Sequence, residues 1–208
     1  MEKIIESLQT IAKSQRILQP EQTIELWLMP LKPYWNEKSS EISPEIVPKL
    51  ENALLSLLKI NHGELNVACA TSIGINLYHL YNLDPHKHFW NLMSNVTDYS
   101  TKANIIALRY VVSKLGKFNK SSLGKITQHL LSLKEQTLHY PALLALKSLF
   151  KSCGRSLSKS APTAFKFAKS YVQYSSSTNE ATQIAALLLL DTLLQYPDDI
   201  PTKKVINC

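Results

Sequence analysis

The sequence predicts an all-α protein, a right-handed α-solenoid in which helix pairs stack one after another. The first observation is a repeat: Ala107-Leu108 recurs 38 positions later as Ala145-Leu146, and each copy ends in glycine followed by a cation. A third copy follows 41 positions on at Ala186-Leu187, and a weaker one precedes them at Ala70. The second observation is that the chain is poor in glycine and rich in Leu, Ala, Lys and Ser, which favours helix over sheet. A period of about 40 residues with two helices per unit is typical of helical solenoids. An ordinary helical bundle is the alternative.

Residues 1–43 are predicted to be the less regular part of the fold. Apolar residues at helical spacing predict a helix over 2–18 and a short buried helix over 21–29. The polar run with adjacent serines at 36–43 predicts a loop between helices. Two prolines should break the pattern before that loop, because proline lacks the N–H that a helix interior needs: Pro30 and Pro33.

Residues 44–196 are predicted to hold the repeats, and 197–208 a C-terminal tail. Ser43 supplies a capping hydroxyl, and the proline and acid that follow it favour a helix start, from which a helix should run to about residue 60. Gly116 and Gly154 stand where a left-handed capping residue is expected. The later helices alternate between long apolar and shorter polar ones, over 64–83 and 85–96, 100–116 and 121–133, 138–154 and 161–174, and 179–195.

Composition and cysteine spacing predict a cytoplasmic protein. Cys69, Cys153 and Cys208 are odd in number and far apart, which indicates a reducing compartment without a disulfide framework. The first 13 residues carry acids among their apolar residues and do not resemble a secretory signal. The longest apolar run, Ile184–Leu190, is too short for a transmembrane segment. Any membrane association is therefore expected to occur through partners.

Positive charge is concentrated in the two central repeats. Residues 101–170 hold 13 Lys+Arg and one acid, whereas residues 1–100 hold 8 and 11, and residues 171–208 hold 2 and 4. Residues one repeat apart lie side by side in a stacked array, so these cations are expected to form one positive surface. We call it the basic edge, and it comprises Lys114, Lys117, Lys120, Lys125, Lys151, Arg155, Lys159, Lys166 and Lys169.

A basic edge suits an acidic protein surface or an acidic peptide as its partner. Nucleic acid and an anionic membrane surface are alternatives, and so is a solvated surface without a partner. Base stacking would need aromatic rings among the cations, and Phe165 and Phe167 are available there but cannot share one helix face.

The sequence predicts neither catalysis nor a bound cofactor or metal. The six histidines have no nucleophile motif beside them, and His86 and His88 are two apart, which makes them diverge on a helix. The tryptophans are predicted to pack between helices, and Cys69 and Cys153 to be small buried apolar residues.

The repeats resemble HEAT and armadillo-type helical repeat proteins over about residues 45–196. The resemblance lies in the period and in the endings ALRYVVSKLGK and ALKSLFKSCGR. The proline of the first repeat helix and the Asp and Arg ladder of that family are mostly missing. Within the family, the order of segments is most similar to the N-terminal region of the very large HEAT-repeat accessory proteins of clathrin-adaptor traffic.

The resemblance implies a non-catalytic protein-interaction scaffold that is part of a larger assembly in vesicle traffic. The alternative function is a nucleic-acid-associated helical-repeat protein that uses the basic face of residues 101–170. A third possibility is an enzyme that uses the repeats as a frame. The sequence has no catalytic motif, which disfavours the enzyme, and no zinc-finger, RRM or KH signature, which disfavours the nucleic-acid binder.

Overall fold

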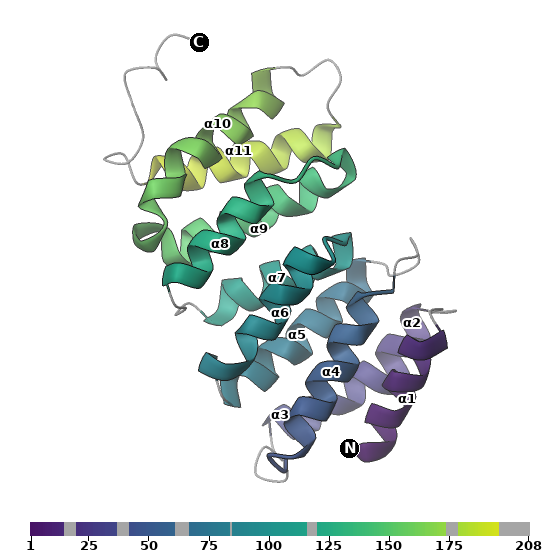
Figure 1. Cartoon of the computed structure of the whole chain (residues 1–208). Helices are drawn as coiled ribbons and strands as arrows, with labels where there is room; N and C mark the ends of the chain where they lie inside the picture. The colour runs from purple at the N-terminus through teal and green to yellow at the C-terminus, as the bar shows by residue number, and fades with distance from the viewer. Residues whose placement is uncertain are drawn as a thin grey trace. The chain divides into compact units, whose positions relative to one another are not determined.

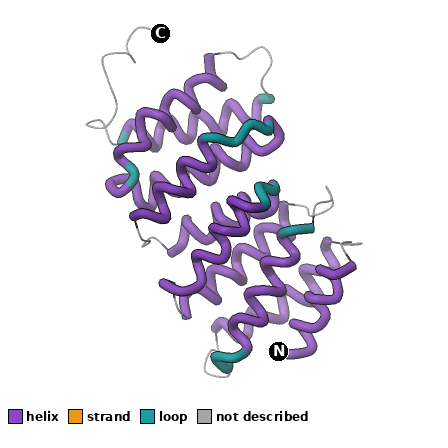
Figure 2. The backbone as a smooth tube through the Cα atoms, viewed as in Figure 1, coloured by secondary structure: helices purple, strands orange, loops and turns teal. Residues whose placement is uncertain are grey.

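The computed structural model describes residues 1–14, 20–36, 42–60, 67–83, 85–115, 120–173 and 179–195, and gives no side-chain positions for residues 20, 85–90, 114–115 and 120–122. Every element in these ranges is a helix or a helical turn, so the predicted all-α class is confirmed for the described part of the chain (Figures 1 and 2). The chain divides into two compact units, Met1–Val111 and Val112–Cys208. Among the described helices we find no candidate for a membrane-spanning segment.

The first unit begins with a helix and a continuous series of short helical turns. These elements are α1 (Glu2–Ser14), α2 (Pro20–Thr23), the π-turn η1 (Ile24–Leu28), the 3-10 turn η2 (Met29–Leu31) and α3 (Lys32–Asn36). At the two prolines the α-helical pattern is interrupted by a 3-10 turn, although the chain stays helical. Pro30 lies within η2 and Pro33 in the first turn of α3, positions where the missing N–H removes no helical hydrogen bond. The predicted loop over 36–43 falls mostly outside the described residues.

Four longer helices follow, and the last of them extends past the end of the first unit at Val111. They are α4 (Ile46–Leu58), α5 (Val67–Leu83), α6 (Pro85–Asp98) and α7 (Lys102–Leu115). The chain turns before α4 as Ser43 predicts, since the Ser43 Oγ accepts a hydrogen bond from the Glu45 N–H at 3.3 Å and the Ser43 carbonyl accepts one from the Ile46 N–H at 2.9 Å. Helix α1 packs against α4, α4 against α5, and α5 against α6. The contacts from α4 to α6 therefore join neighbours in sequence, whereas α1 reaches α4 across the short elements that lie between them in the chain.

The second unit holds the remaining long helices and three short turns. Its elements are α8 (Lys120–Leu131), η4 (Gln136–Leu138), α9 (His139–Cys153), η5 (Gly154–Ser156), η6 (Ser158–Ser160), α10 (Ala161–Gln173) and α11 (Glu180–Leu194). Helix α11 packs on both α9 and α10 (Figure 1). All seven predicted helices after residue 60 are present, with bounds that agree to within a helical turn in the described ranges.

The predicted left-handed cap at Gly154 is wrong. Gly154 has φ −49° and ψ −45°, ordinary right-handed helical values, and begins the turn η5. It is buried, and its carbonyl accepts a hydrogen bond from the Leu157 N–H at 2.9 Å. The helical path of α9 is interrupted at Cys153, with φ −136° and ψ 17°, and Gly154 starts a separate 3-10 turn. Gly116 lies outside the described residues.

The small residues of the repeats lie where helices approach closely. A Cβ at Gly74 on α5 would stand 3.1 Å from the Cα of Ala107 on α7 and 3.1 Å from the Cβ of Tyr110. Ala107 and Leu108 are fully buried, as are Ala145, Leu146 and Ala186 in the second unit. Leu187, the last member of the Ala-Leu series, is 51% exposed. The repeat pattern predicts burial at all of these positions, and the prediction is wrong only for Leu187.

Candidate functional site

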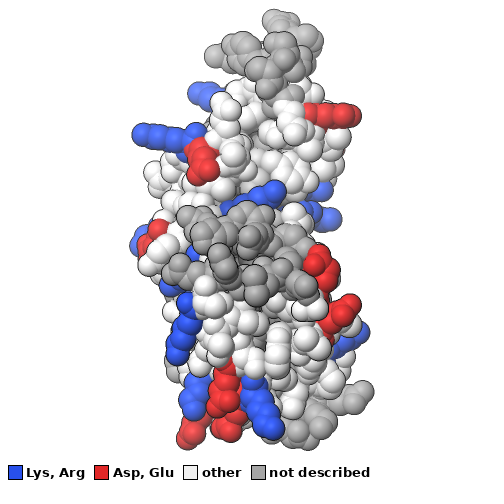
Figure 3. Space-filling model, turned by 90° about the vertical axis from the view of Figure 1, so that its right-hand side faces the viewer, with Lys and Arg blue, Asp and Glu red and all other residues white. Residues whose placement is uncertain are grey.

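All nine residues of the basic edge belong to the second unit. Lys125, Lys151, Arg155, Lys159 and Lys166 are exposed, and Lys169 is half-buried. Lysine and arginine side chains project from the face of the molecule shown in Figure 3, with acidic side chains among them. Three residues are not described at the side-chain level, because Lys117 lies outside the described residues and only the backbone is given at Lys114 and Lys120.

One residue of the basic edge, Lys159, lines a groove of about 430 Å³ together with polar side chains. The groove lies between α8 and the segment formed by η6 and the first turn of α10. The lining combines one ammonium group with hydroxyl, amide and apolar groups, from Gly124, Gln128, Leu131, Ser132, Lys159, Ser160 and Thr163. The Ser132 hydroxyl already donates its proton to the His129 carbonyl at 2.8 Å. The Lys159 ammonium, the Gln128 amide and the Ser160 and Thr163 hydroxyls are also hydrogen-bond donors, so the groove is suited to carboxylate groups.

Two consecutive 3-10 turns fix the position of the cations beside the groove. Leu157 separates η5 from η6 and is only 2% exposed, so its side chain anchors the segment in the core. The Ser160 N–H donates to the Leu157 carbonyl at 2.8 Å. Arg155 and Lys159 stand two residues on either side of Leu157 and are both exposed. The local sequence therefore alternates between a buried anchor and exposed cations.

Sequence reasoning found Lys159 but missed the polar residues opposite it. Gly124 leaves room on α8, since a Cβ there would meet nothing within 4 Å. Gln128 and Ser132 follow Gly124 at i+4 and i+8, so the three residues share one side of α8 and the turn after it. This spacing is visible in the sequence, but the sequence does not show that η6 packs against that side. None of the other basic-edge residues whose side chains are described lines the groove, although Lys125 adjoins Gly124 in sequence: they are Lys125, Lys151, Arg155, Lys166 and Lys169.

The aromatic residues near the basic edge are engaged with one another. His139, Phe167 and Tyr171 form T-shaped ring contacts with centroids 5.3 to 5.7 Å apart. The His139 Nε2 lies 2.9 Å from the Leu133 carbonyl, which can only accept, so Nε2 carries the proton and Nδ1 accepts the Tyr171 hydroxyl proton at 2.6 Å. Burial raises the pKa of Tyr171. Phe165 and Phe167 are both half-buried.

A buried polar network in the first unit links α4, α6 and α7. The Asn104 Nδ2 donates to the Tyr99 carbonyl at 2.8 Å and to the Leu58 carbonyl at 3.3 Å, and its Oδ1 accepts from Asn95 Nδ2 at 2.7 Å. Asn95 also donates to the Leu55 carbonyl at 3.3 Å. Leu55 and Leu58 lie in the last turn of α4, where carbonyls have no partner within the helix. The network therefore caps helix ends, and its burial identifies it as structural.

A second polar contact joins α4 and α6 beside a buried tyrosine of α5. Glu51 is 2% exposed and its Oε2 accepts a hydrogen bond from the Asn91 Nδ2 at 3.0 Å. Tyr81 is fully buried, and burial together with the neighbouring Glu51 carboxylate raises the pKa of its hydroxyl well above the ordinary value. Both groups are closed to solvent, which indicates a role in packing.

The predicted packing roles of Cys69 and Trp35 are confirmed. Cys69 is fully buried on α5, and burial together with the charge of Glu21 raises the pKa of its thiol to about 12. The Trp35 Nε1 donates to Asn76 Oδ1 at 2.8 Å, and its ring stacks on His79 with centroids 5.9 Å apart. Burial lowers the pKa of His79. Cys153 is only half-buried, and burial raises the pKa of its thiol as well.

The described residues contain no group of three or more His, Cys, Asp or Glu side chains placed to hold a metal ion. The side chains of His86, His88 and Trp90 lie outside the described part.

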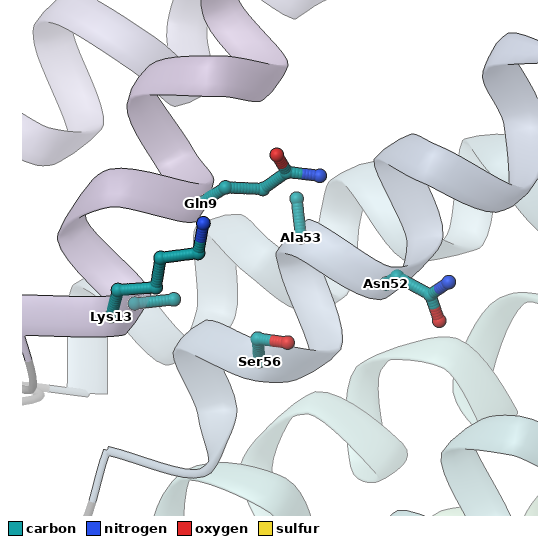
Figure 4. A pocket seen from close by; sticks show the side chains of 6 residues that line it. Gln9, Lys13, Asn52, Ala53 and Ser56 are labelled. Atoms are coloured by element: carbon teal, nitrogen blue, oxygen red, sulfur yellow. The ribbon is translucent and has the colours of Figure 1, made fainter.

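A second hollow, of about 400 Å³, lies between α1 and α4 of the first unit (Figure 4). Gln9 and Lys13 reach it from α1, and Asn52 and Ser56 lie across from them on α4. Lys13 is the charged residue of its lining, and the hollow belongs to the first unit, whereas the basic edge belongs to the second. We therefore take the groove beside Lys159 as the candidate site.

Comparison of the chain with models of protein families, with curated proteins and with solved structures found no match.

Proposed function

We propose that this chain is a non-catalytic protein-interaction scaffold, a right-handed α-solenoid of HEAT-like helix pairs, that binds an acidic surface or peptide of a partner protein. The observation that carries the proposal is the groove of the second unit, where Lys159 stands among hydroxyl and amide donors and exposed cations flank it. Carboxylates of a partner would accept hydrogen bonds from these groups, and the surrounding charge would orient the partner.

The charge of the second unit supports an acidic partner. Residues 112–208 hold 13 Lys+Arg and 5 Asp+Glu, whereas residues 1–111 hold 10 and 11. The positive surface therefore belongs to one unit, and the groove lies within that unit. The Leu157 anchor supports recognition rather than a non-specific coat, because it fixes the backbone on which Arg155 and Lys159 stand.

The resemblance to HEAT-repeat accessory proteins supports a setting in vesicle traffic, as part of a larger assembly in the cytoplasm. Membrane association would then occur through the partner.

Nucleic acid is the runner-up ligand, because phosphate groups would also be attracted to these cations. The aromatic rings give it less support. Phe167 and Tyr171 already pack on His139 and are half-buried, so they present little free face for stacking on bases.

The proposal is tested by fluorescence anisotropy with a labelled 15-residue peptide of Glu and Ala. We expect Lys159→Glu to weaken binding by about tenfold, since it places a like charge in the groove. Lys49→Glu, an equal charge change at an exposed position of the first unit, is the matched control and should leave the affinity within about twofold. A labelled oligo-dT of equal charge is titrated in parallel.

Equal affinities for the wild type and Lys159→Glu would overturn the assignment of the groove. Preference for oligo-dT over the peptide, with a steep loss of affinity on adding salt, would replace the acidic protein by nucleic acid.

A further inference from the structure

The terminal helix α11 presents a row of exposed apolar side chains. Ile184 is 50% exposed, Leu187 51%, Leu188 37% and Leu194 48%. The opposite side of the same helix is buried against α9 and α10, through Ala185, Ala186, Leu189 and Leu193. Helix α11 is therefore apolar almost all round but is covered on one side only, which is the pattern of a helix with a second packing face.

The equivalent face is buried one repeat earlier. At the spacing of 41, Ile184 and Leu187 correspond to Leu143 and Leu146 of α9, and both of these leucines are fully buried. Asp191 corresponds to Phe150, which is 1% exposed. The same positions therefore serve for helix packing in α9 and are open to solvent in α11.

The exposed face of α11 also carries negative charge. Positions 180, 184, 187, 191 and 194 follow one another at spacings of three and four, so they share one side of the helix. Glu180 and Asp191 are exposed on that side, and α11 contains no Lys or Arg. Where α9 has a buried phenylalanine, α11 has a carboxylate in the middle of the apolar row.

We propose that this side of α11, the α11 face, is a docking site for an amphipathic helix of a partner protein that carries Lys or Arg along its apolar stripe. The apolar side chains supply the area to be buried, and the partner's cations would pair with Glu180 and Asp191. The α11 face is separate from the groove beside Lys159 and opposite in charge, so the two surfaces accept partners of different chemistry.

A second copy of this chain is a poorer occupant. Antiparallel pairing of two α11 helices centred on Leu187 and Leu188 would place Asp191 against Ile184 of the other copy. Because α11 has no cation, the carboxylate would lose water without gaining a charge partner. Charge complementarity therefore favours a basic helix.

The test is titration of the full chain with a labelled 18-residue helical peptide of Leu and Lys, with Leu at positions i, i+3, i+4 and i+7. Leu187→Gln should weaken binding about tenfold because it removes an apolar anchor, and Asp191→Lys should do the same through charge repulsion. Met29→Gln, at a side chain 56% exposed in the first unit, is the matched control and should leave the affinity unchanged. Circular dichroism would verify that each variant is folded.

Three results would overturn the proposal. One is equal binding of a peptide in which Glu replaces every Lys, and another is an unchanged affinity in both α11 variants. The third is self-association of the wild type, measured by analytical ultracentrifugation, that Leu187→Gln abolishes. Lys159→Glu should not affect binding of the Leu and Lys peptide, so failure of this proposal is distinguishable from failure of the groove assignment.

Discussion

Gly74 and Gly124 are both helical glycines, but their surroundings differ. Gly74 faces the backbone of α7, with the Ala107 Cα and the Ala107 carbonyl oxygen 3.1 and 3.2 Å from the position of an added Cβ. Gly124 has nothing within 4 Å of that position. The same substitution therefore has opposite consequences at the two sites.

We expect Gly74→Ala to destabilise the protein by about 1 to 2 kcal/mol, because α5 and α7 must move apart. Gly124→Ala should stabilise it by about 0.5 to 1 kcal/mol through helix propensity. Urea unfolding followed by circular dichroism measures both. Equal effects of the two substitutions would contradict the close approach of α5 and α7.

The Cys69 thiol gives the protein a predictable sensitivity to alkali. Its pKa is about 12 in the folded state, so the folded protein keeps this proton when the unfolded chain, with an ordinary thiol, loses it. The contribution of the protonated thiol to the free energy of unfolding is complete below about pH 8.5. It is lost as the pH rises towards 12, with a slope of up to about 1.4 kcal/mol per pH unit. The raised pKa of Tyr81 adds a loss of the same sign at higher pH.

We expect the free energy of unfolding of Cys69→Ala to fall less steeply than that of the wild type between pH 9 and 10. Urea unfolding at several pH values measures the two slopes, and Tyr81→Phe is a control that should change the slope mainly above pH 10. Parallel curves for the wild type and Cys69→Ala would show that the thiol is not protected by burial.

At the scale of the elements, the spacing of apolar residues was sufficient to predict the long helices. Each helix needs an apolar face to pack on its neighbours, and polar segments interrupt the apolar spacing between helices. The apolar spacing failed where a local alternative competes with the α-helix. Gly154 begins the turn η5 with helical angles, Ile24–Leu28 forms a π-turn, and Met29–Leu31, which contains Pro30, forms a 3-10 turn. Such turns have no period of their own in the sequence.

The candidate site was predictable only in part, for a related reason. The charge counts and the repeat predicted Lys159 as part of the basic edge, but the groove depends on the contact between η6 and α8, which is tertiary. The exposure of Leu187 was equally hidden, since its sequence context repeats that of the buried Leu146.

The polar network around Asn104 supplies hydrogen bonds to backbone carbonyls at the C-terminal end of α4 and just after α6. Asn104 is fully buried, and four hydrogen bonds join its side chain to Asn95, Leu58, Tyr99 and Thr101. Its removal would take one hydrogen bond from the buried Asn95 amide and would leave the Leu58 and Tyr99 carbonyls with only the bonds that Thr101 donates, from its Oγ1 at 3.2 Å and its N–H at 2.6 Å. Buried polar groups that lose partners cost more than the hydrogen bonds themselves contribute.

We expect Asn104→Ala to lower the free energy of unfolding by about 2 to 4 kcal/mol. Asn52→Ala, the same change at an exposed position of α4, should change it by less than about 0.5 kcal/mol. Thermal or urea unfolding compares the two variants. A small effect at Asn104 would mean that the hydrogen bonds donated by Thr101 are sufficient for these carbonyls.

At the scale of the whole molecule, the two units differ in net charge. The first unit is close to neutral by residue count, whereas the second carries the excess of cations and the whole basic edge. The second unit also carries the apolar and acidic α11 face. Both proposed docking surfaces therefore belong to the second unit.

The measurement that tests the scaffold proposal most directly is affinity capture from cells of the source organism with three baits. One is the wild type, one carries Lys125→Glu, Lys159→Glu and Lys166→Glu, and one carries Lys3→Glu, Lys32→Glu and Lys49→Glu as a control of equal charge change on the first unit. The account predicts proteins that the wild type and the control recover and that the second-unit variant loses. Identical recovery by all three baits, or recovery of nucleic acid that nuclease treatment removes, would contradict it.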